Sequence, residues 1–194
     1  MDERAPKTPD ELDQGYCMNA RTTILTSYAE WTVLSALRSR APIKNRNDVY
    51  GLIAKLMFDE VINKSHGPIQ QREFDAWHRR TLNGIVLGHS RMANQYGWAA
   101  KIVNVYLKTY CYVADGGREG IRNCLHPPID SGLWKGVRRN FKHDNKTLAD
   151  IQRVKTIAAI DSYEKYERIV RGLKAVAEKV SCSLIEVEQF WEKA

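Results

Sequence analysis

The chain has few cysteines, and their spacing matches neither a metal site nor a disulfide framework. Its 194 residues include four cysteines, at positions 17, 111, 124 and 182. No pair forms a CxxC motif or another spacing typical of zinc, and small secreted domains carry cysteine more densely. Cys111 lies inside an apolar run, where cysteine packs as a small core residue. We therefore expect no metal and no cofactor.

Long apolar runs and strand patterns are also missing. No segment approaches the roughly 20 apolar residues that cross a bilayer, so no membrane contact is expected. The polar start of the chain lacks the basic and apolar regions of a signal peptide. It is predicted to be a flexible arm, residues 1–20, followed by one helical domain of two lobes, residues 21–194.

Apolar residues recur at helical spacing through most of the chain, which indicates an all-α fold. Capping-box patterns open two of the expected helices, at Asp161-x-x-Glu164 and Ser183-x-x-Glu186. The predicted helices span residues 22–40, 47–63, 69–87, 98–114, 131–140, 147–157, 161–179 and 183–192.

The net charge of +7 lies in one part of the sequence. Residues 65–146 contain 13 Lys and Arg but six Asp and Glu, whereas residues 1–64 and 147–194 are each balanced. A basic segment between neutral flanks is typical of a protein that binds a polyanion. A basic surface that only aids solubility would give the same count. Aromatic residues interleaved with the charges favour nucleic acid as the partner.

One segment joins an apolar helix to a carboxylate on a stiff turn. Lys101, Asn104, Lys108 and Tyr112 recur at i, i+3, i+7 and i+11, which predicts one polar stripe on the helix. Asp130 follows a Pro-Pro pair that holds the backbone extended, and it is the predicted N-cap of the next helix. A solvated helix face and a simple N-cap explain the same residues without any chemistry.

The order of these residues resembles the core of the helix-hairpin-helix DNA glycosylases. Tyr-Gly-Trp-Ala-Ala-Lys-Ile-Val-Asn-Val-Tyr-Leu-Lys, followed by His-Pro-Pro-Ile-Asp, is most similar to the archaeal 8-oxoguanine DNA glycosylase branch. The resemblance covers residues 88–140. It implies a bilobal helical bundle with a cleft between the lobes, Lys101 as the nucleophile, Lys108 as a second lysine and Asp130 as the catalytic carboxylate.

The same resemblance implies contacts to DNA. The family's Leu-x-Gly-x-Gly hairpin, whose glycines let backbone N–H groups approach a phosphate, is reduced here to Gly88 and Tyr96-Gly97. The aromatic residues near the lysines and the aspartate are candidates for stacking on an everted base. The predicted substrate or DNA contacts are Lys108, Arg91, Tyr96, Gly97, Trp98, Asn104, His126, Trp134, Arg138 and Arg139.

The implied chemistry requires a neutral amine. Partial burial and the nearby Lys108 would disfavour the charged form of Lys101, which could then form a Schiff base at the sugar C1′. Asp130 would stabilise positive charge on the sugar or accept a proton. If Lys101 contacts phosphate instead, Asp130 would activate water. The expected substrate is an oxidised or otherwise modified base flipped out of double-stranded DNA. A base modified by a phage, and hence a defence role, is left open.

Two other functions are also left open. The first is a nucleic-acid-binding protein with the same scaffold and no catalysis. The second is a ribonuclease of the HEPN type, because Arg72-Glu-Phe-Asp-Ala-Trp-His78 has the arginine-to-histidine spacing of that motif. We expect a cytoplasmic monomer, associated with the nucleoid when it is bound to DNA.

Overall fold

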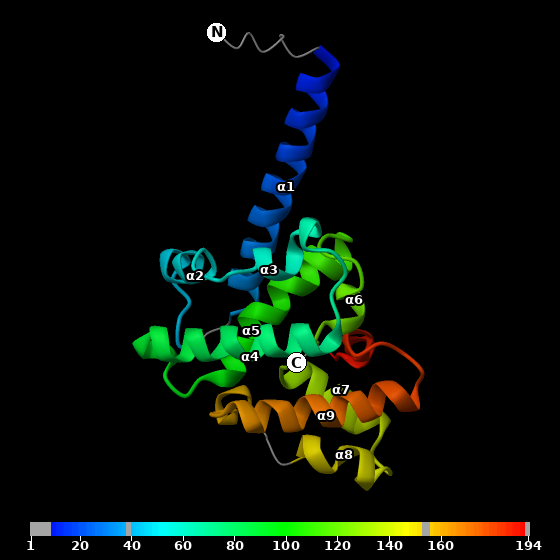
Figure 1. Ribbon diagram of the computed structural model, residues 1–194. Helices are drawn as coiled ribbons and strands as arrows, with labels where there is room; N and C mark the ends of the chain where they lie inside the picture. The colour runs from blue at the N-terminus through cyan, green and yellow to red at the C-terminus, as the bar shows by residue number, and fades with distance from the viewer. Residues whose placement is uncertain (1–8, 38–39, 153–155, 193–194) are drawn as a thin grey trace.

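The computed structural model describes residues 9–37, 40–152 and 156–192. Within these ranges the chain forms helices and connecting loops without a strand, which confirms the predicted all-α fold (Figure 1). None of the described helices is long and apolar enough to cross a membrane. The α-helices are α1 (Pro9–Ala36), α2 (Arg46–Ile53), α3 (Asp59–Ile62), α4 (Gln71–Gly88), α5 (Tyr96–Leu107), α6 (Ile121–Cys124), α7 (Ser131–Asn140), α8 (Asn145–Gln152) and α9 (Tyr163–Lys179).

Short helical segments of other types connect these helices or end the chain. The 3-10 turns are η1 (Lys64–His66), η2 (Ser90–Met92), η4 (Ile157–Ala159) and η5 (Ile185–Phe190). The segment η3 (Lys108–Val113) is a π-helix that continues α5 directly. π-helical turns are rare and occur often at functional sites, so the end of α5 is a candidate position for such a site.

Helix α5 is the centre of the molecule. Every residue from Gly97 to Leu107 is buried, and α1, α4, α9 and η4 pack around the helix. A mostly apolar helix is expected in such a position, because few of its side chains gain from contact with water. Figure 1 shows α4 crossing α5 and α9 lying beside α4, while the N-terminal part of α1 projects away from the other helices.

Several predicted boundaries were wrong. Helix α1 begins at Pro9, so part of the predicted flexible arm is helical, whereas residues 1–8 of that arm lie outside the described residues. Proline favours the first helical position because its missing N–H is one that a helix leaves unpaired there. The predicted helix 47–63 is two helices, with Phe58 buried in the turn between them.

Local hydrogen bonds explain two further differences near the C-terminus. Ser162, and not Asp161, caps α9, because its hydroxyl accepts the N–H of Lys165 at 3.3 Å. The predicted helix 183–192 is the 3-10 turn η5. Glu186 still accepts the N–H of Ser183 at 2.8 Å, which is half of the expected capping box.

Glycines on α7 let the end of the chain lie directly on this helix. A Cβ at Gly136 would overlap the carbonyl oxygen of Phe190, and one at Gly132 would overlap the indole nitrogen of Trp191. Phe190 is the last residue of η5, and Trp191 follows it directly. The close approach fixes Trp191 beside the N-terminus of α7.

Substitution of Gly136 by alanine is therefore expected to lower the free energy of unfolding by about 1–3 kcal/mol, because a backbone atom cannot move aside as a flexible side chain can. Gly84→Ala in α4 is the matched control, since its Cβ would meet no atom within 4 Å. That change is expected to raise the free energy of unfolding by about 0.5–1 kcal/mol through helix propensity. Urea denaturation of both variants measures the difference, and effects of equal sign would contradict this account.

Candidate active site

Lys101 and Asp130 meet in a pocket bordered by α1, α5, η3, the start of α7 and the segment around η5. The Nζ atom of Lys101 lies 3.5 Å from Oδ2 of Asp130, and the two side chains are 9% and 26% exposed. The pocket has a volume of about 440 Å³. The structure thus brings the two predicted residues together at one cavity, while their catalytic roles stay a prediction.

Asp130 is oriented by hydrogen bonds to one of its two carboxylate oxygens. Its backbone is extended, and Oδ1 accepts the N–H of Leu133 at 3.1 Å, which confirms the predicted N-cap of α7. The same oxygen accepts the indole N–H of Trp191 at 3.0 Å. Because these donors occupy Oδ1, the carboxylate presents Oδ2 to Lys101.

Asn104 holds the turn that carries Asp130. Its side-chain amide donates to the carbonyl oxygen of Pro127 at 3.2 Å and to the hydroxyl of Tyr166 at 3.0 Å. Its own Oδ1 lies 2.9 Å from Nε2 of His78. Helix α5 therefore carries the lysine on one side and anchors the turn of the carboxylate on another.

The buried polar network continues to the surface through His126. Nδ1 of His126 lies 2.9 Å from the Tyr166 hydroxyl, and its Nε2 lies 3.2 Å from Oδ1 of Asp75. Burial is the main cause that lowers the pKa of His126, and burial also lowers the pKa of His78 to about 3. Both rings are therefore neutral near pH 7. The hydrogen bonds are consistent with Tyr166 donating to His126 and with His126 donating to Asp75.

The second lysine has a partner that the sequence did not indicate. Nζ of Lys108 lies 2.6 Å from Oε1 of Glu188, and both side chains are mostly buried. Burial raises the pKa of Glu188, and Lys108 partly offsets that effect. Beside this pair, the hydroxyls of Thr32 and Thr109 lie 2.9 Å apart and join α1 to η3.

Exposed aromatic rings border the pocket. Tyr28 and Trp31 of α1 are stacked, with ring centroids 5.7 Å apart and an angle of 21° between the planes. They are 52% and 54% exposed, and Trp191 is 37% exposed. All of them line the pocket. Sequence reasoning missed them because apolar residues at helical spacing, here with Ile24, are usually part of the core.

The predicted stacking residues occupy other places. Trp98 and Trp134 are buried in the core, with 6% and 4% exposure, because large aromatic rings fill the space between packed helices. Trp98 still contacts Lys101, since Nζ of Lys101 lies over the Trp98 ring, 5.8 Å from its centroid. The Tyr96 hydroxyl donates to Oδ1 of Asn83 at 2.9 Å.

Other predicted DNA contacts are corrected in the same way. Asn104 and His126 are buried in the network described above, so neither presents a polar group to a phosphate. The N–H of Gly97 donates to the carbonyl oxygen of Ile160 at 3.0 Å, and a Cβ at Gly97 would overlap the carbonyl oxygen of Ile157. The glycine thus permits close packing of α5 against η4.

The predicted arginine contacts are also engaged within the protein. Arg91 pairs with Asp48 at 3.0 Å, next to α2 and away from the Lys101 pocket. Arg139 pairs with Glu192 at 3.3 Å, and Arg138 at the end of α7 is partly buried. Acidic residues outside residues 65–146 form ion pairs with many basic residues of this segment. The excess of basic residues in the segment therefore does not form a separate basic surface. The acidic partners are Asp48, Glu60, Glu164, Glu188 and Glu192.

The ribonuclease motif does not form a common site. His78 is fully buried, whereas Arg72 is exposed on the same helix α4. Six residues advance a helix by about 600°, which places the two side chains on different faces. The placement of these two side chains therefore gives the ribonuclease alternative no support.

In the ranges that the structure describes, no group of three or more His, Cys, Asp or Glu side chains is placed to hold a metal ion. Comparisons with protein-family models, curated proteins and solved structures find no significant match to this chain. Its function is therefore inferred from its own geometry.

Proposed function

We propose that the protein is a DNA glycosylase that excises an everted, oxidised or otherwise modified base from double-stranded DNA. The observation that carries the proposal is the 3.5 Å contact between Lys101 and Asp130 in a pocket bordered by exposed aromatic rings. A base within a duplex must leave the stack before its glycosidic bond can be reached. Aromatic faces at the pocket entrance stabilise a base that has lost its neighbours.

In the proposed reaction, Nζ of Lys101 first transfers a proton to Oδ2 of Asp130. The neutral amine attacks C1′ of the sugar as the bond between C1′ and the base nitrogen breaks, and the electron pair leaves with the base. Asp130 returns its proton to the departing base, and its carboxylate stabilises the positive charge on the sugar. Ring opening leaves a Schiff base between Lys101 and C1′, which water hydrolyses. In a monofunctional variant of this mechanism, Asp130 activates a water molecule that attacks C1′ directly.

Borohydride trapping tests the proposal. The full-length protein is incubated with duplexes that contain an abasic site, an oxidised base or another modified base, including bases found in phage DNA. A covalent adduct or an abasic product is expected with at least one duplex, and mass spectrometry of the released base identifies the substrate. Neither adduct nor abasic product across the set would reject the proposal. Release of a phage-specific base would indicate a defence role.

A second candidate, a nucleic-acid-binding protein without catalysis, is favoured by the structural use of Asp130. Its Oδ1 caps α7 and accepts a hydrogen bond from Trp191, which is sufficient reason for an aspartate at this position. Such a protein would use the same aromatic rings but release no base.

The aromatic border makes a prediction under either candidate. Trp31→Ala is expected to weaken binding to a duplex with one unpaired nucleotide by about 1–3 kcal/mol, or roughly 5- to 150-fold, through loss of stacking. Fluorescence anisotropy measures the affinity. Ile24→Ala is the matched control, because Ile24 is 70% exposed on the same helix but does not line the pocket. Equal losses in both variants would show that the effect is not specific to the pocket.

A further inference from the structure

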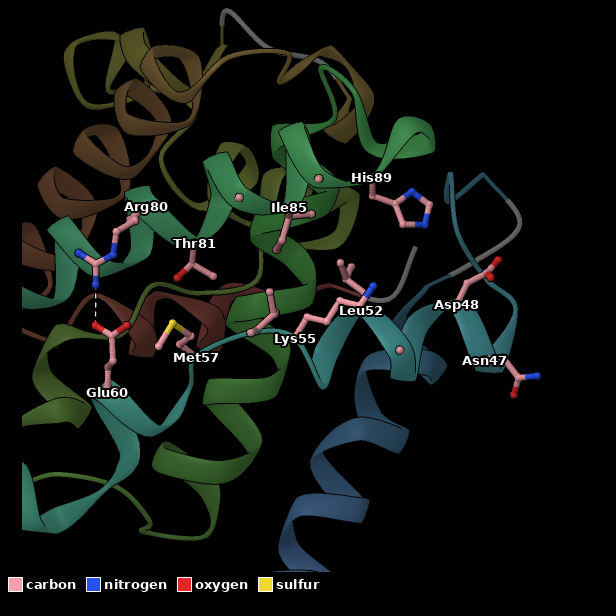
Figure 2. Close-up of a pocket in the computed structure, with 14 residues that line it drawn as sticks. Asn47, Asp48, Leu52, Lys55, Met57, Glu60, Arg80, Thr81, Ile85 and His89 are labelled. Atoms are coloured by element: carbon pink, nitrogen blue, oxygen red, sulfur yellow. Dashed lines mark hydrogen bonds and ion pairs between the residues drawn. The ribbon is translucent and has the colours of Figure 1, made fainter.

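A second cavity lies between α2 and α4, and it shares no lining residue with the Lys101 pocket. Its volume is about 510 Å³, within the range of roughly 300–1,000 Å³ that is usual for small-molecule sites. Its apolar floor includes Leu52 and Ile85, which are nearly fully buried. Figure 2 shows the two helices facing each other across the groove, with charged side chains at its ends.

Glycines keep this groove open. Gly51 of α2 and Gly84 and Gly88 of α4 line it, and a Cβ at any of them would meet no atom within 4 Å. Alanine would therefore fit at each position, and within a helix glycine is less stable than alanine by about 0.5–1 kcal/mol. The packing of the protein does not require these glycines. Their absent side chains instead allow a bound molecule to approach the helix backbone closely.

The charges along the groove differ in their pairing. Arg80 and Glu60 are 2.5 Å apart at one end, and Asp48 pairs with Arg91 at the other. Lys55 has no ion-pair partner among the described residues, and Figure 2 shows its side chain lying in the groove between α2 and α4. Nearby, Nδ1 of His89 is buried without a hydrogen-bond partner in the described structure. The groove therefore offers an unpaired cation beside an apolar floor.

We propose that this groove binds a small organic anion with a flat apolar body and a single phosphate or carboxylate group. The anionic group would pair with Lys55, and the flat body would lie on Leu52 and Ile85 against the backbone at Gly84. A nucleoside monophosphate and an aromatic carboxylic acid both have this chemistry. The site is independent of the proposed glycosylase reaction.

Titration with 8-anilinonaphthalene-1-sulfonate, an aromatic body with one anionic group, tests the proposal by fluorescence. The wild-type protein is expected to bind the dye saturably. Gly84→Leu fills the groove and is expected to weaken binding by about tenfold or more, and Lys55→Gln by roughly fivefold. Lys64→Gln, which removes an exposed lysine outside the groove, and Trp31→Ala, which alters the other pocket, are expected to leave binding unchanged. Competition by adenosine 5′-monophosphate and by indole-3-acetate then distinguishes the two ligand classes.

The inference is overturned if the dye does not bind saturably, or if Gly84→Leu and Lys55→Gln bind it as the wild type does. It is also overturned if Trp31→Ala is the variant that loses binding. Thermal unfolding of each variant separates a blocked groove from a misfolded chain, because leucine is favourable in a helix and is expected to preserve or raise the stability of α4.

Discussion

Replacement of Asp130 by asparagine is expected to slow base excision by about 10²–10⁴-fold while DNA binding persists. Asparagine keeps the side-chain oxygen that caps α7 and accepts the Trp191 indole, so the turn is expected to stay in place. It removes the charge and the proton acceptor that face Lys101. Single-turnover rates on the duplex identified by trapping, together with anisotropy on the same duplex, measure the two properties separately.

Lys101→Met extends this prediction to the amine. Methionine keeps most of the apolar contacts of a side chain that is 9% exposed, but it cannot form a Schiff base. Loss of the borohydride-trapped adduct is expected. Asp115→Asn is the matched control, since Asp115 is exposed and pairs with Arg122 on the surface. Excision at the wild-type rate in the Asp130 and Lys101 variants would place the chemistry elsewhere in the molecule.

Acid is expected to destabilise the protein through His78. Burial, with a smaller contribution from His126, lowers the pKa of His78 from 6.5 to about 3 in the folded state. The folded protein holds the ring neutral, so its contribution to stability is complete above pH 6.5 and is lost as the pH falls toward 3. The free energy of unfolding is expected to fall through this window, by roughly 5 kcal/mol in total.

His78→Gln tests this expectation, because glutamine can still donate to Asn104 but does not titrate in this range. The free energy of unfolding in urea, measured between pH 7 and pH 4, is expected to fall less steeply for the variant than for the wild type. His66→Gln, which changes an exposed histidine, is expected to keep the wild-type slope. Parallel curves for wild type and His78→Gln would show that another group controls acid unfolding. His126, which is also buried and neutral, is the first alternative.

Local patterns predicted the parts of the fold that depend on neighbours in sequence. The limits of α7 at Ser131 and Asn140 and the N-cap at Asp130 agree with the prediction, because capping is a contact over three residues. The apolar run likewise predicted a buried α5. The predicted polar stripe on α5 was only partly correct. Asn104 lies about 60° around the helix from Lys101, which is enough to turn it toward α4 and α9 instead of the pocket.

Contacts between distant segments could not be predicted in this way. Glu188 reaches Lys108 across 80 residues, and Trp191 reaches Asp130 across 61. Nothing in the sequence around Glu188 or Trp191 distinguishes these two residues from ordinary surface residues. The ion pairs of residues 65–146 could not be predicted for the same reason, because their acidic partners come from both flanks of the segment.

The Lys101 pocket is lined by α1, near the start of the described chain, and by Glu188 and Trp191, near its end. Residues of α5 and η3, which lie between these segments in the sequence, complete the lining. Bringing segments that are so far apart in the sequence together costs chain entropy before any contact between them is gained. We therefore expect the amine and the carboxylate to be enclosed late in folding, after the central helices have packed. A partly folded chain would leave both groups in open water, so Lys101 is sheltered from water only in molecules that have completed folding.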